Sequence, residues 1–408
     1  MIVNRCERHY IKKFHKGFNI IDELCFQSKN IYNEANYLIR QKFATSGEII
    51  KRYDMQVIMK DMDCYKALGS NTGQVTIQKL DQNWKSFLIA IKDWTNNPRK
   101  YLGRPKIPKY LKKNGRFVVG LTNNKFKIVD GYIRFSWKKL YQLNHIFKTR
   151  IPDIAKLMQV RFVPRGIYYV MEICYQIEVP DRVEEFKRIA SIDIGVENFI
   201  TMVNNIGEKP IVIKGGVIKS INQYFNKKKS KMQSELKRCN NRDWSKNLEK
   251  LSRKRYEMIK YQMHCISKYI VDYCVLYNID TLVIGHNKRW KQENNNKQNF
   301  SYIPYELFIN MLKYKCENNG IMGIEIAESY TSGTSFLDKE DPIKDNYDKS
   351  RRVCRGLFRS NKGMKINADV NAAYQIMKKA IPEALIDGIE GAYLHPTIIN
   401  LTEVRSVA

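Results

Sequence analysis

The spacing of apolar residues changes along the chain, and each change predicts a different kind of element. Residues 1–11, "MIVNRCERHYI", are predicted to form a strand, and from about residue 19 the apolar positions recur every three or four residues, as on a helix. A second helical stretch follows residue 70, with its apolar side chains on one face. These positions are Ile77, Leu80, Trp84, Phe87, Ile91 and Trp94. The chain is therefore predicted to begin with a strand and to continue as a helical lobe.

The middle of the chain is rich in predicted strands. "GRPKIPKY", residues 103–110, combines prolines with cations and predicts an extended linker that closes the helical stretch. Residues 116–179 are then predicted to form several strands, with Asp130-Gly131 as a hairpin turn inside "KFKIVDGYIRFSW". We expect a small twisted sheet or barrel here.

Beyond Pro180, predicted strands come first and then alternate with helices. "RIASIDIGVENFITMVNN" predicts a pair of strands, "PIVIKGG" predicts another, and long basic helices are expected over about 218–236 and 244–274. Strands resume in "DTLVIGHNK" and "GIEIAES", and a last helix begins near "NADVNAAYQIMKKAI". This order is typical of an α/β core of ribonuclease-H-like type, so the predicted fold class is α/β and multi-domain.

Composition narrows the class of partner. The chain has 408 residues, more than one core usually spans, and Lys and Arg outnumber Asp and Glu by 71 to 41, for a net charge of +30. Such an excess predicts a polyanionic partner, with nucleic acid as the leading candidate. Because no apolar run approaches ~20 residues and no signal-peptide pattern is present, we expect a cytoplasmic protein without a membrane partner.

The nine cysteines are scattered, with no C-x-x-C pair and no histidines at finger-like spacing from them. A zinc site is therefore not expected. An odd count without a regular framework is typical of a reducing compartment, where buried thiols serve as small apolar side chains.

Two acids stand where a carboxylate is costly. Asp193, in "IASIDIGVENF", lies near the end of an apolar strand, so it needs a hydrogen-bonding partner, a cap or a cation. In "INADVNAAYQI", either Asn367 or Asp369 could cap the helix, yet Asp369 also lies on the core-facing stripe with Ile376 and would then project toward the sheet. Two inward acids in a very basic protein fit two-metal phosphodiester hydrolysis, which usually needs a third carboxylate to hold two Mg²⁺ ions.

Four segments carry a resemblance to a known family. "SIDIGVENFITM", "TLVIG", "ESYTSGTSF" and "RGLFRSNKGMKINADVNAAYQI" resemble the RuvC-like nuclease domain of TnpB proteins, the transposon-encoded RNA-guided nucleases ancestral to type V CRISPR effectors. "LDQNWKSFLIAIKDWTNNPRKYLGRPKIPKY" is similar to that family's recognition helix and Gly-Arg-Pro segment. The resemblance therefore covers most of the chain.

This resemblance implies an RNA-guided DNA endonuclease of prokaryotic cytoplasm, associated with the nucleoid. Such a protein binds a guide RNA from the transposon end, as one monomer per guide, and cleaves double-stranded target DNA beside a short flanking motif. The implied cofactor is Mg²⁺, two ions, with Mn²⁺ as a substitute. The implied domains are a first wedge strand over 1–18, a helical recognition lobe over 19–113, the remaining strand-rich wedge domain over 114–182, and a RuvC-like nuclease domain over 183–408.

The middle catalytic acid departs from the family pattern. The resemblance assigns Asp193 and Asp369 as the first and last catalytic and metal-binding acids, but the family's glutamate position is Gly285 here. Either the nuclease is inactive, or another acid has taken the role, and "GIEIAESYTSG" offers Glu325 and Glu328. Side chains alternate along a strand, so only one of the two can face the site. Glu328 is the preferred third acid because it stands at the strand's end beside the Tyr-Thr-Ser segment; Glu325 is the alternative.

A second departure concerns the zinc ribbon of the family's target-nucleic-acid-binding lobe. Many family members carry two C-x-x-C pairs between the Tyr-Thr-Ser segment and the last aspartate, whereas this chain has only Cys354 there. We expect the lobe, residues 329–364, to fold without zinc around a small apolar cluster. Its predicted members are Phe336, Leu337, Leu357 and Phe358.

Basic runs predict contacts with phosphates. They include "NKKKSK", "SRKRY", "NKRWK" and "KSRRVCR", and each phosphate contact would steepen the salt dependence of binding. Trp290 could stack on a base or anchor its own loop, and base sequence would be read by the guide. The predicted nucleic-acid-binding residues are Lys85, Arg104, Lys288, Arg289, Trp290, Arg351, Arg352 and Arg355.

Two other functions stay open at this stage. A nuclease-inactive, RNA-guided DNA-binding repressor would explain why Gly285 stands in place of the family's glutamate, although Asp193 and Asp369 are retained. A guide-independent transposase would share the ribonuclease-H-like core. Cleavage of a target plasmid separates the first alternative from the nuclease, and the presence of a defined bound RNA separates the second.

Overall fold

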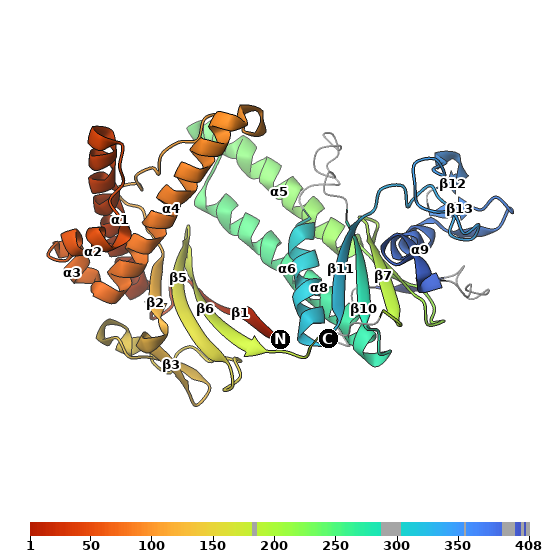
Figure 1. Cartoon of the computed structure of the whole chain (residues 1–408), viewed down its shortest axis with the longest axis horizontal. Coiled ribbons are helices and arrows are strands. Elements are labelled where there is room, and N and C mark those ends of the chain that lie inside the picture. Colours follow the sequence, from red (N-terminus) through yellow and green to blue (C-terminus); the bar gives the residue numbers. More distant parts are fainter. Residues whose placement is uncertain (182–185, 287–302, 355, 386–395, 401–403, 405–408) are drawn as a thin grey trace. The chain divides into compact units, whose positions relative to one another are not determined.

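A computed structural model describes residues 1–408 except 182–185, 287–302, 355, 386–395, 401–403 and 405–408. The chain divides into two compact units (Figure 1). The first unit is Ile2–Glu178, and the second is Met1 with Val179–Ala408. Within the described residues, no helix combines the length and the apolar character that crossing a bilayer would require.

The first unit contains an antiparallel sheet in the order β1-β6-β5-β2. Its strands are β1 (Ile2–Ile11), β2 (Val119–Thr122), β5 (Lys156–Arg165) and β6 (Tyr168–Glu178). A separate hairpin joins β3 (Phe126–Val129) to β4 (Tyr132–Phe135) through Asp130 and Gly131. Both turn residues have positive φ, 52° and 72°, as this kind of tight hairpin requires. The predicted first strand and hairpin turn are confirmed.

Four helices follow β1: α1 (Phe18–Ser46), α2 (Arg52–Met59), α3 (Asp63–Leu68) and α4 (Ser70–Asn96). Of these, α1 and α4 pack on the sheet, α2 packs on α4, and α3 packs on α1 and α4. The predicted apolar stripe of α4 is buried at Ile77, Leu80 and Trp84, and the Trp84 indole donates to Asn36 Oδ1 of α1 at 2.9 Å. The predicted linker "GRPKIPKY" has no helix or strand and is held along α1, where Asn36 donates to the carbonyl of Pro108. The short helices α2 and α3 were not predicted.

The second unit is built on a six-stranded sheet in the order β11-β10-β7-β8-β9-β15. The strands are β7 (Ile189–Ile194), β8 (Asn198–Asn204), β9 (Ile211–Lys214), β10 (Thr281–His286), β11 (Met322–Ala327) and β15 (Thr397–Ile399). Neighbours β7, β8 and β9 are antiparallel, whereas β10 runs parallel to β7, and β11 parallel to β10. The helices between β9 and β10 are α5 (Gly216–Asn240) and α6 (Lys246–Leu276), and α8 (Tyr305–Asn318) precedes β11. The second unit therefore begins with strands and continues with alternating helices and strands, as predicted.

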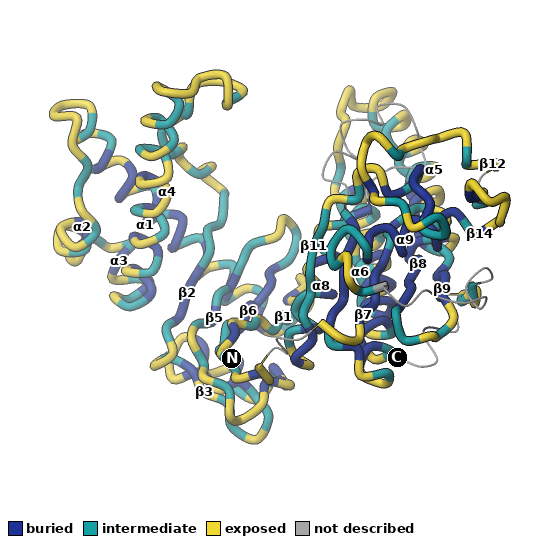
Figure 2. Tube along the Cα trace, turned by 45° about the vertical axis from the view of Figure 1, so that its right-hand side comes forward, coloured by how far each residue is buried: buried dark blue, intermediate teal, exposed yellow. Residues whose placement is uncertain are grey.

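The two faces of this sheet pack against different helices. One face, with Ile189 and Val283, joins a buried cluster with α9 (Ala368–Ala380). The other face, with Ile192 and Ile284, packs with apolar residues of α6 and α8. Figure 2 shows the strands β7 and β8 as dark-blue, buried segments. Alternate residues of a strand point to opposite faces of the sheet, so a residue's position along its strand decides which helices it contacts.

A small three-stranded sheet precedes α9. It consists of β12 (Arg352–Cys354), β13 (Leu357–Arg359) and β14 (Lys365–Asn367), and β14 leads directly into the helix. Phe358 is buried against α9, with Phe336 and Leu337 partly buried beside it. The Phe336 ring stacks on Tyr374, with 4.3 Å between centroids. The predicted apolar cluster is confirmed for these three residues, and Leu357 is half-buried.

Gly285 lies buried on β10 beneath α9, and the space there explains the glycine. A Cβ at this position would overlap the Cδ1 atom of Ile376 and come within 3.2 Å of the Ile192 carbonyl oxygen. A side chain at position 285 would therefore have to displace the Ile376 side chain of α9.

We expect Gly285→Ala to lower the free energy of unfolding by about 1–3 kcal/mol, because an added methyl in a packed core forces neighbours apart. Chemical denaturation would measure the loss. Gly103→Ala is the matched control, since a Cβ there meets nothing within 4 Å. Adding Ile376→Ala to Gly285→Ala should show a favourable coupling in a double-mutant cycle, since it removes the overlapping atoms. Equal effects of the two glycine substitutions would contradict this packing.

Candidate active site

Asp193 belongs to the face of the sheet that packs against α9. It follows Ile189 and Ser191 by steps of two along β7, and the Ser191 hydroxyl donates to the carbonyl of Ala373 in α9 at 2.6 Å. Asp193 itself is half-buried, at the end of β7 where the strand turns at Gly195. The strand thus delivers one carboxylate to the edge of the sheet beside the start of α9.

Asp369 stands in the first turn of α9. Asn367 caps this helix, with its Oδ1 accepting from the backbone N–H groups of Asp369 and Val370 at 3.0 and 3.1 Å. The sequence left open which residue caps, and the structure assigns the cap to Asn367. The carboxylate of Asp369 is therefore available for contacts outside the helix.

Glu328 directly follows β11 and lies two residues after Ile326, so the two share one face of the sheet. Ile326 packs in the α9 cluster. Its Oε2 atom is buried and has no hydrogen-bond partner among the described residues. Burial raises the pKa of Glu328 to about 7. A buried, unpartnered carboxylate oxygen is costly, which is typical of a group that awaits a proton or a cation.

The three acids act on one another electrostatically. Burial raises the pKa of Asp193 well above its usual range, and the negative charges of Glu328 and Asp369 raise it further. The nearby Arg352 guanidinium acts in the opposite direction. The structure therefore brings Asp193, Glu328 and Asp369 together at one edge of the sheet, although they are far apart in sequence.

Glu325 lies on the opposite face. Its carboxylate contacts His286 Nδ1 at 2.9 Å and forms an ion pair with Lys313 of α8. The hydrogen bond from Lys313 lowers the pKa of Glu325, and His286 acts in the same direction. This acid is thus already paired on the side of α8 and does not join the other three.

Two cations and an amide complete the surroundings of Asp369. Arg352 Nη2 lies 3.2 Å from its Oδ1, and Asn198 Nδ2 donates to its Oδ2 at 2.6 Å. Lys214 in turn donates to Asn198 Oδ1 at 2.8 Å. Asn198 and Lys214 were not identified from the sequence, where the only signal was the position of Asn198 at the start of a strand after the Asp193 turn.

These residues line a cleft of ≈ 940 Å³ in the second unit. Its walls carry Asp193 and Asp369 together with Lys214 and Arg352. Acids that can hold metal and cations that can face phosphate therefore share one cleft. Phosphodiester chemistry requires both kinds of group.

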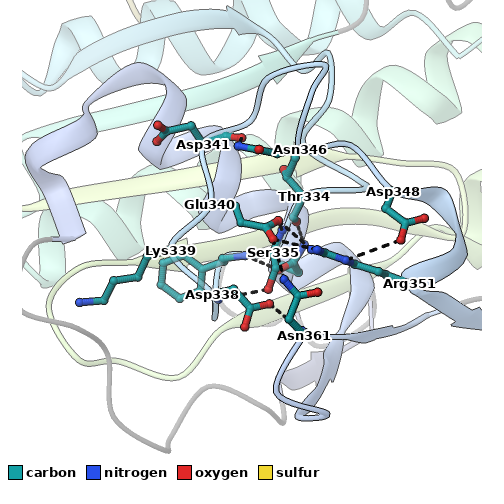
Figure 3. A network of polar contacts seen from close by, with 12 residues as sticks. Thr334, Ser335, Asp338, Lys339, Glu340, Asp341, Asn346, Asp348, Arg351 and Asn361 are labelled. Atoms are coloured by element: carbon teal, nitrogen blue, oxygen red, sulfur yellow. Dashed lines mark hydrogen bonds and ion pairs between the residues drawn. The ribbon is translucent and has the colours of Figure 1, made fainter.

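Arg351, the neighbour of Arg352, is engaged elsewhere (Figure 3). Its guanidinium donates two hydrogen bonds to the carboxylate of Glu340, at 2.7 and 2.8 Å, and is largely buried. Glu340 also accepts from the Ser335 N–H and from Asn361. This network holds the segment before β12 in place, so Arg351 serves the lobe rather than a surface open to nucleic acid.

The other predicted nucleic-acid-binding residues are dispersed. Lys85 pairs with Asp81 on the exposed side of α4 at 2.9 Å, and the Arg104 guanidinium lies over the Trp94 ring, 5.8 Å from its centroid. Four further residues lie outside the described part of the chain: Lys288, Arg289, Trp290 and Arg355.

The donor set fits Mg²⁺ in its chemistry. Three carboxylates offer the hard oxygen ligands that this ion selects, and the unpartnered oxygen of Glu328 has a free coordination position. Among the described residues, no three His, Cys, Asp or Glu side chains stand close enough to enclose an ion as they are. Holding Mg²⁺ therefore requires the three side chains to turn inward from these positions.

Arg352→Ala should tighten binding of divalent cations at this site, because the guanidinium competes for Asp369. Removing one positive charge from beside partly exposed carboxylates should make the free energy of Mn²⁺ binding about 1 kcal/mol more favourable. The Kd for Mn²⁺ should therefore fall about five-fold. Titration followed by the electron paramagnetic resonance signal of free Mn²⁺ measures this without any cleavage assay. Lys349→Ala, a nearby exposed cation, should leave the Kd unchanged. Weaker Mn²⁺ binding in Arg352→Ala would show that the arginine supports the metal site.

Comparison with known proteins places two segments of the chain in families. Residues 172–291 match the OrfB_IS605 family, described as a probable transposase, and residues 305–376 match the Cas12f1-like TNB domain. The TnpB-like protein ORF457 of Acidianus two-tailed virus is 24% identical over 391 residues, which cover 87% of this chain and 82% of that protein.

A second relative is the CRISPR-associated endodeoxyribonuclease Cas12f2 of Micrarchaeota archaeon (strain CG1_02_47_40). It is 24% identical over 364 residues, covering 84% of this chain but only 59% of the relative.

Two solved structures share the fold. A Cas12f1–sgRNA–target DNA complex aligns with a TM-score of 0.56 and 14% identity, over 89% of this chain and 83% of that one. The mini-RNA-guided endonuclease CRISPR-Cas_phi3 aligns with a TM-score of 0.51 and 10% identity, over 95% and 93% of the two chains. The mixed α/β, multi-sheet architecture is therefore that of these effector proteins.

Proposed function

The chain belongs to the TnpB family, and from this premise we propose that it is an RNA-guided DNA endonuclease. It would bind a transposon-derived guide RNA and cleave target DNA beside a short flanking motif by Mg²⁺-dependent hydrolysis. The observation that carries the proposal is that Asp193 and Asp369 line one cleft and that Glu328 follows β11 on the same face of the sheet. On this proposal, Glu328 would serve as the third acid beside the two retained family acids.

Charge and relatives support the same partners. A net charge of +30 suits a protein that holds both RNA and DNA. One relative is named an endodeoxyribonuclease, and one structural neighbour was solved with a guide RNA and target DNA. In the proposed RNA-guided endonuclease, the RNA would recognise the target sequence, and this chain would contact the phosphates and cleave the DNA.

We assign the parts of the chain accordingly. Residues 1–18 and 114–182 would form the wedge domain, and 19–113 the helical recognition lobe. The RuvC-like nuclease domain would be 183–408, including a target-nucleic-acid-binding lobe over 329–364 that folds without zinc. In that lobe the Glu340–Arg351 ion pair and its hydrogen bonds connect segments that a zinc ion joins in other family members.

The proposed mechanism follows from the positions of the side chains. Bound Mg²⁺ ions would supply an activated water and stabilise the leaving 3′ oxygen. Asp193, Glu328 and Asp369 would hold those ions, and Asn198 would fix the orientation of Asp369 through its hydrogen bond. Arg352 and Lys214 would face the negative charge of the phosphate in the cleft.

The inactive-repressor alternative rests on Gly285. The Ile376 side chain of α9 occupies the space beside Gly285, so the glycine suits the packing of this chain. Glu328 emerges from the next strand on the same face, which favours a relocated acid over a lost one. The second alternative, a guide-independent transposase, is favoured only by the description of the OrfB_IS605 family.

We expect Glu328→Gln to abolish cleavage and Glu325→Gln to preserve it. Loss of a metal-holding carboxylate should reduce the rate by more than the roughly 10- to 100-fold typical of residues that only orient a ligand. The measurement is Mg²⁺-dependent cutting of a target plasmid by protein co-expressed with its native locus. Target binding, followed by gel shift, should persist in both variants. Full cutting by Glu328→Gln with loss in Glu325→Gln would reverse the assignment, and binding without any cutting by the parent protein would establish the repressor.

A defined RNA should co-purify with the protein. When the chain is expressed from its native locus, sequencing of the bound RNA should recover one transcript from the element's end, because a guide is held through many phosphate contacts. Its release should rise steeply with salt concentration. Recovery of scattered host RNA alone would contradict an RNA-guided function and favour the guide-independent transposase.

A further inference from the structure

Two cysteines of the first unit face each other across neighbouring strands. In the antiparallel pairing of β1 with β6, Cys6 stands directly opposite Cys174. Directly opposed residues have Cα atoms about 4.5–5.5 Å apart, which lies within the range of about 4.4–6.8 Å found for disulfides. Each thiol also shifts the pKa of the other. The register therefore places the two backbones at a separation that a disulfide can span.

From this register we propose that Cys6 and Cys174 form a site of reversible oxidation, an intrachain disulfide made by exchange with a low-molecular-weight disulfide. The pair lies in the first unit, and its chemistry is independent of whether the chain cuts DNA. The bond would tie the first strand of the chain to β6 and enclose nearly all of the first unit.

The surroundings of the pair favour a reactive thiolate. Glu172 is buried beside Cys174 and is held by two arginines, Arg8 at 3.1 Å and Arg161 at 2.8 Å. The hydrogen bond from Cys6 lowers the pKa of Cys174 to about 6, and the charges of Arg161 and Arg8 act in the same direction, whereas burial and the charge of Glu172 oppose them. Low-pKa thiols in partly exposed, electropositive surroundings are the ones that exchange.

Access separates this pair from the other cysteines that lie close to each other. Cys6 is exposed and Cys174 is half-buried, so a small disulfide can reach them. Cys274 and Cys316 also influence each other, but both are buried, and burial raises the pKa of each thiol. That second pair is expected to be inert under native conditions.

The exchange balances without any other reactant. The Cys174 thiolate attacks one sulfur of the small disulfide and releases one small thiolate. Cys6 then attacks the Cys174 sulfur, loses its proton and expels the second small thiol. One small disulfide is reduced to two thiols, while the two protein thiols are oxidised to one disulfide.

Mass spectrometry of the full-length protein tests the site. The reduced chain is incubated with oxidised glutathione, free thiols are alkylated, and the peptides are mapped. We expect a cross-link between the peptides of Cys6 and Cys174 as the main product. In Cys6→Ser, Cys174 should instead be trapped as a mixed disulfide with glutathione, whereas the control Cys239→Ser, at an exposed cysteine of α5, should keep the cross-link.

Two further measurements secure the interpretation. The cross-link should be lost when oxidation is carried out in denaturant, because the register exists only in the folded chain. Oxidation should raise the thermal unfolding midpoint of the parent protein by several degrees, and not that of Cys6→Ser or Cys174→Ser, since a cross-link restricts the unfolded chain. Circular dichroism checks that the variants fold. Glutathione on Cys239 or Cys354 with Cys6 and Cys174 still reduced, or cross-links between molecules, would overturn the proposal.

Discussion

Mutual repulsion among Asp193, Glu328 and Asp369 is the constraint on which the candidate site depends. Three carboxylates at one sheet edge are unfavourable unless protons, cations or hydrogen bonds compensate them. The chain supplies part of this compensation: Arg352 and Asn198 both contact Asp369, and the cap by Asn367 leaves that acid free to receive them. Glu328 keeps an unpartnered oxygen. On the proposed function, the charge that is left uncompensated is what would attract divalent cations to the site.

The packing of α9 connects the acid site to the core. This helix must lie close to β7 and β10 to bring Asp369 to the end of β7, and its Ile376 side chain occupies the space that a side chain at position 285 would take. The same approach that positions the last acid therefore removes the space for a middle acid on β10. The neighbouring strand β11 ends one residue before Glu328, and its parity points that residue to the α9 side. On the proposed function, Glu328 would supply from β11 the acid that β10 lacks.

The segment before α9 is held together by polar contacts around Glu340. Glu340 receives hydrogen bonds from Arg351, Ser335 and Asn361, and its own carbonyl accepts from Gln375 of α9. A largely buried, bidentate ion pair with additional hydrogen bonds has its geometry strongly determined. Because Arg352 follows Arg351 directly, the network also determines where the guanidinium that contacts Asp369 enters the cleft.

The local features of this protein could be predicted from its sequence alone. The spacing of apolar residues and the turn residues predicted the strands, the main helices and the Asp130-Gly131 hairpin, since these features depend on neighbours in the chain. Alternation separated Glu325 from Glu328, although it could not say which face of the strand meets α9. Only the tertiary structure decided that face, the contacts of Asn198 and Lys214, the burial of Arg351 against Glu340, and the register that opposes Cys6 to Cys174. Each of these depends on segments far apart in sequence, and their meeting is decided by how helices and sheets pack rather than by any local pattern.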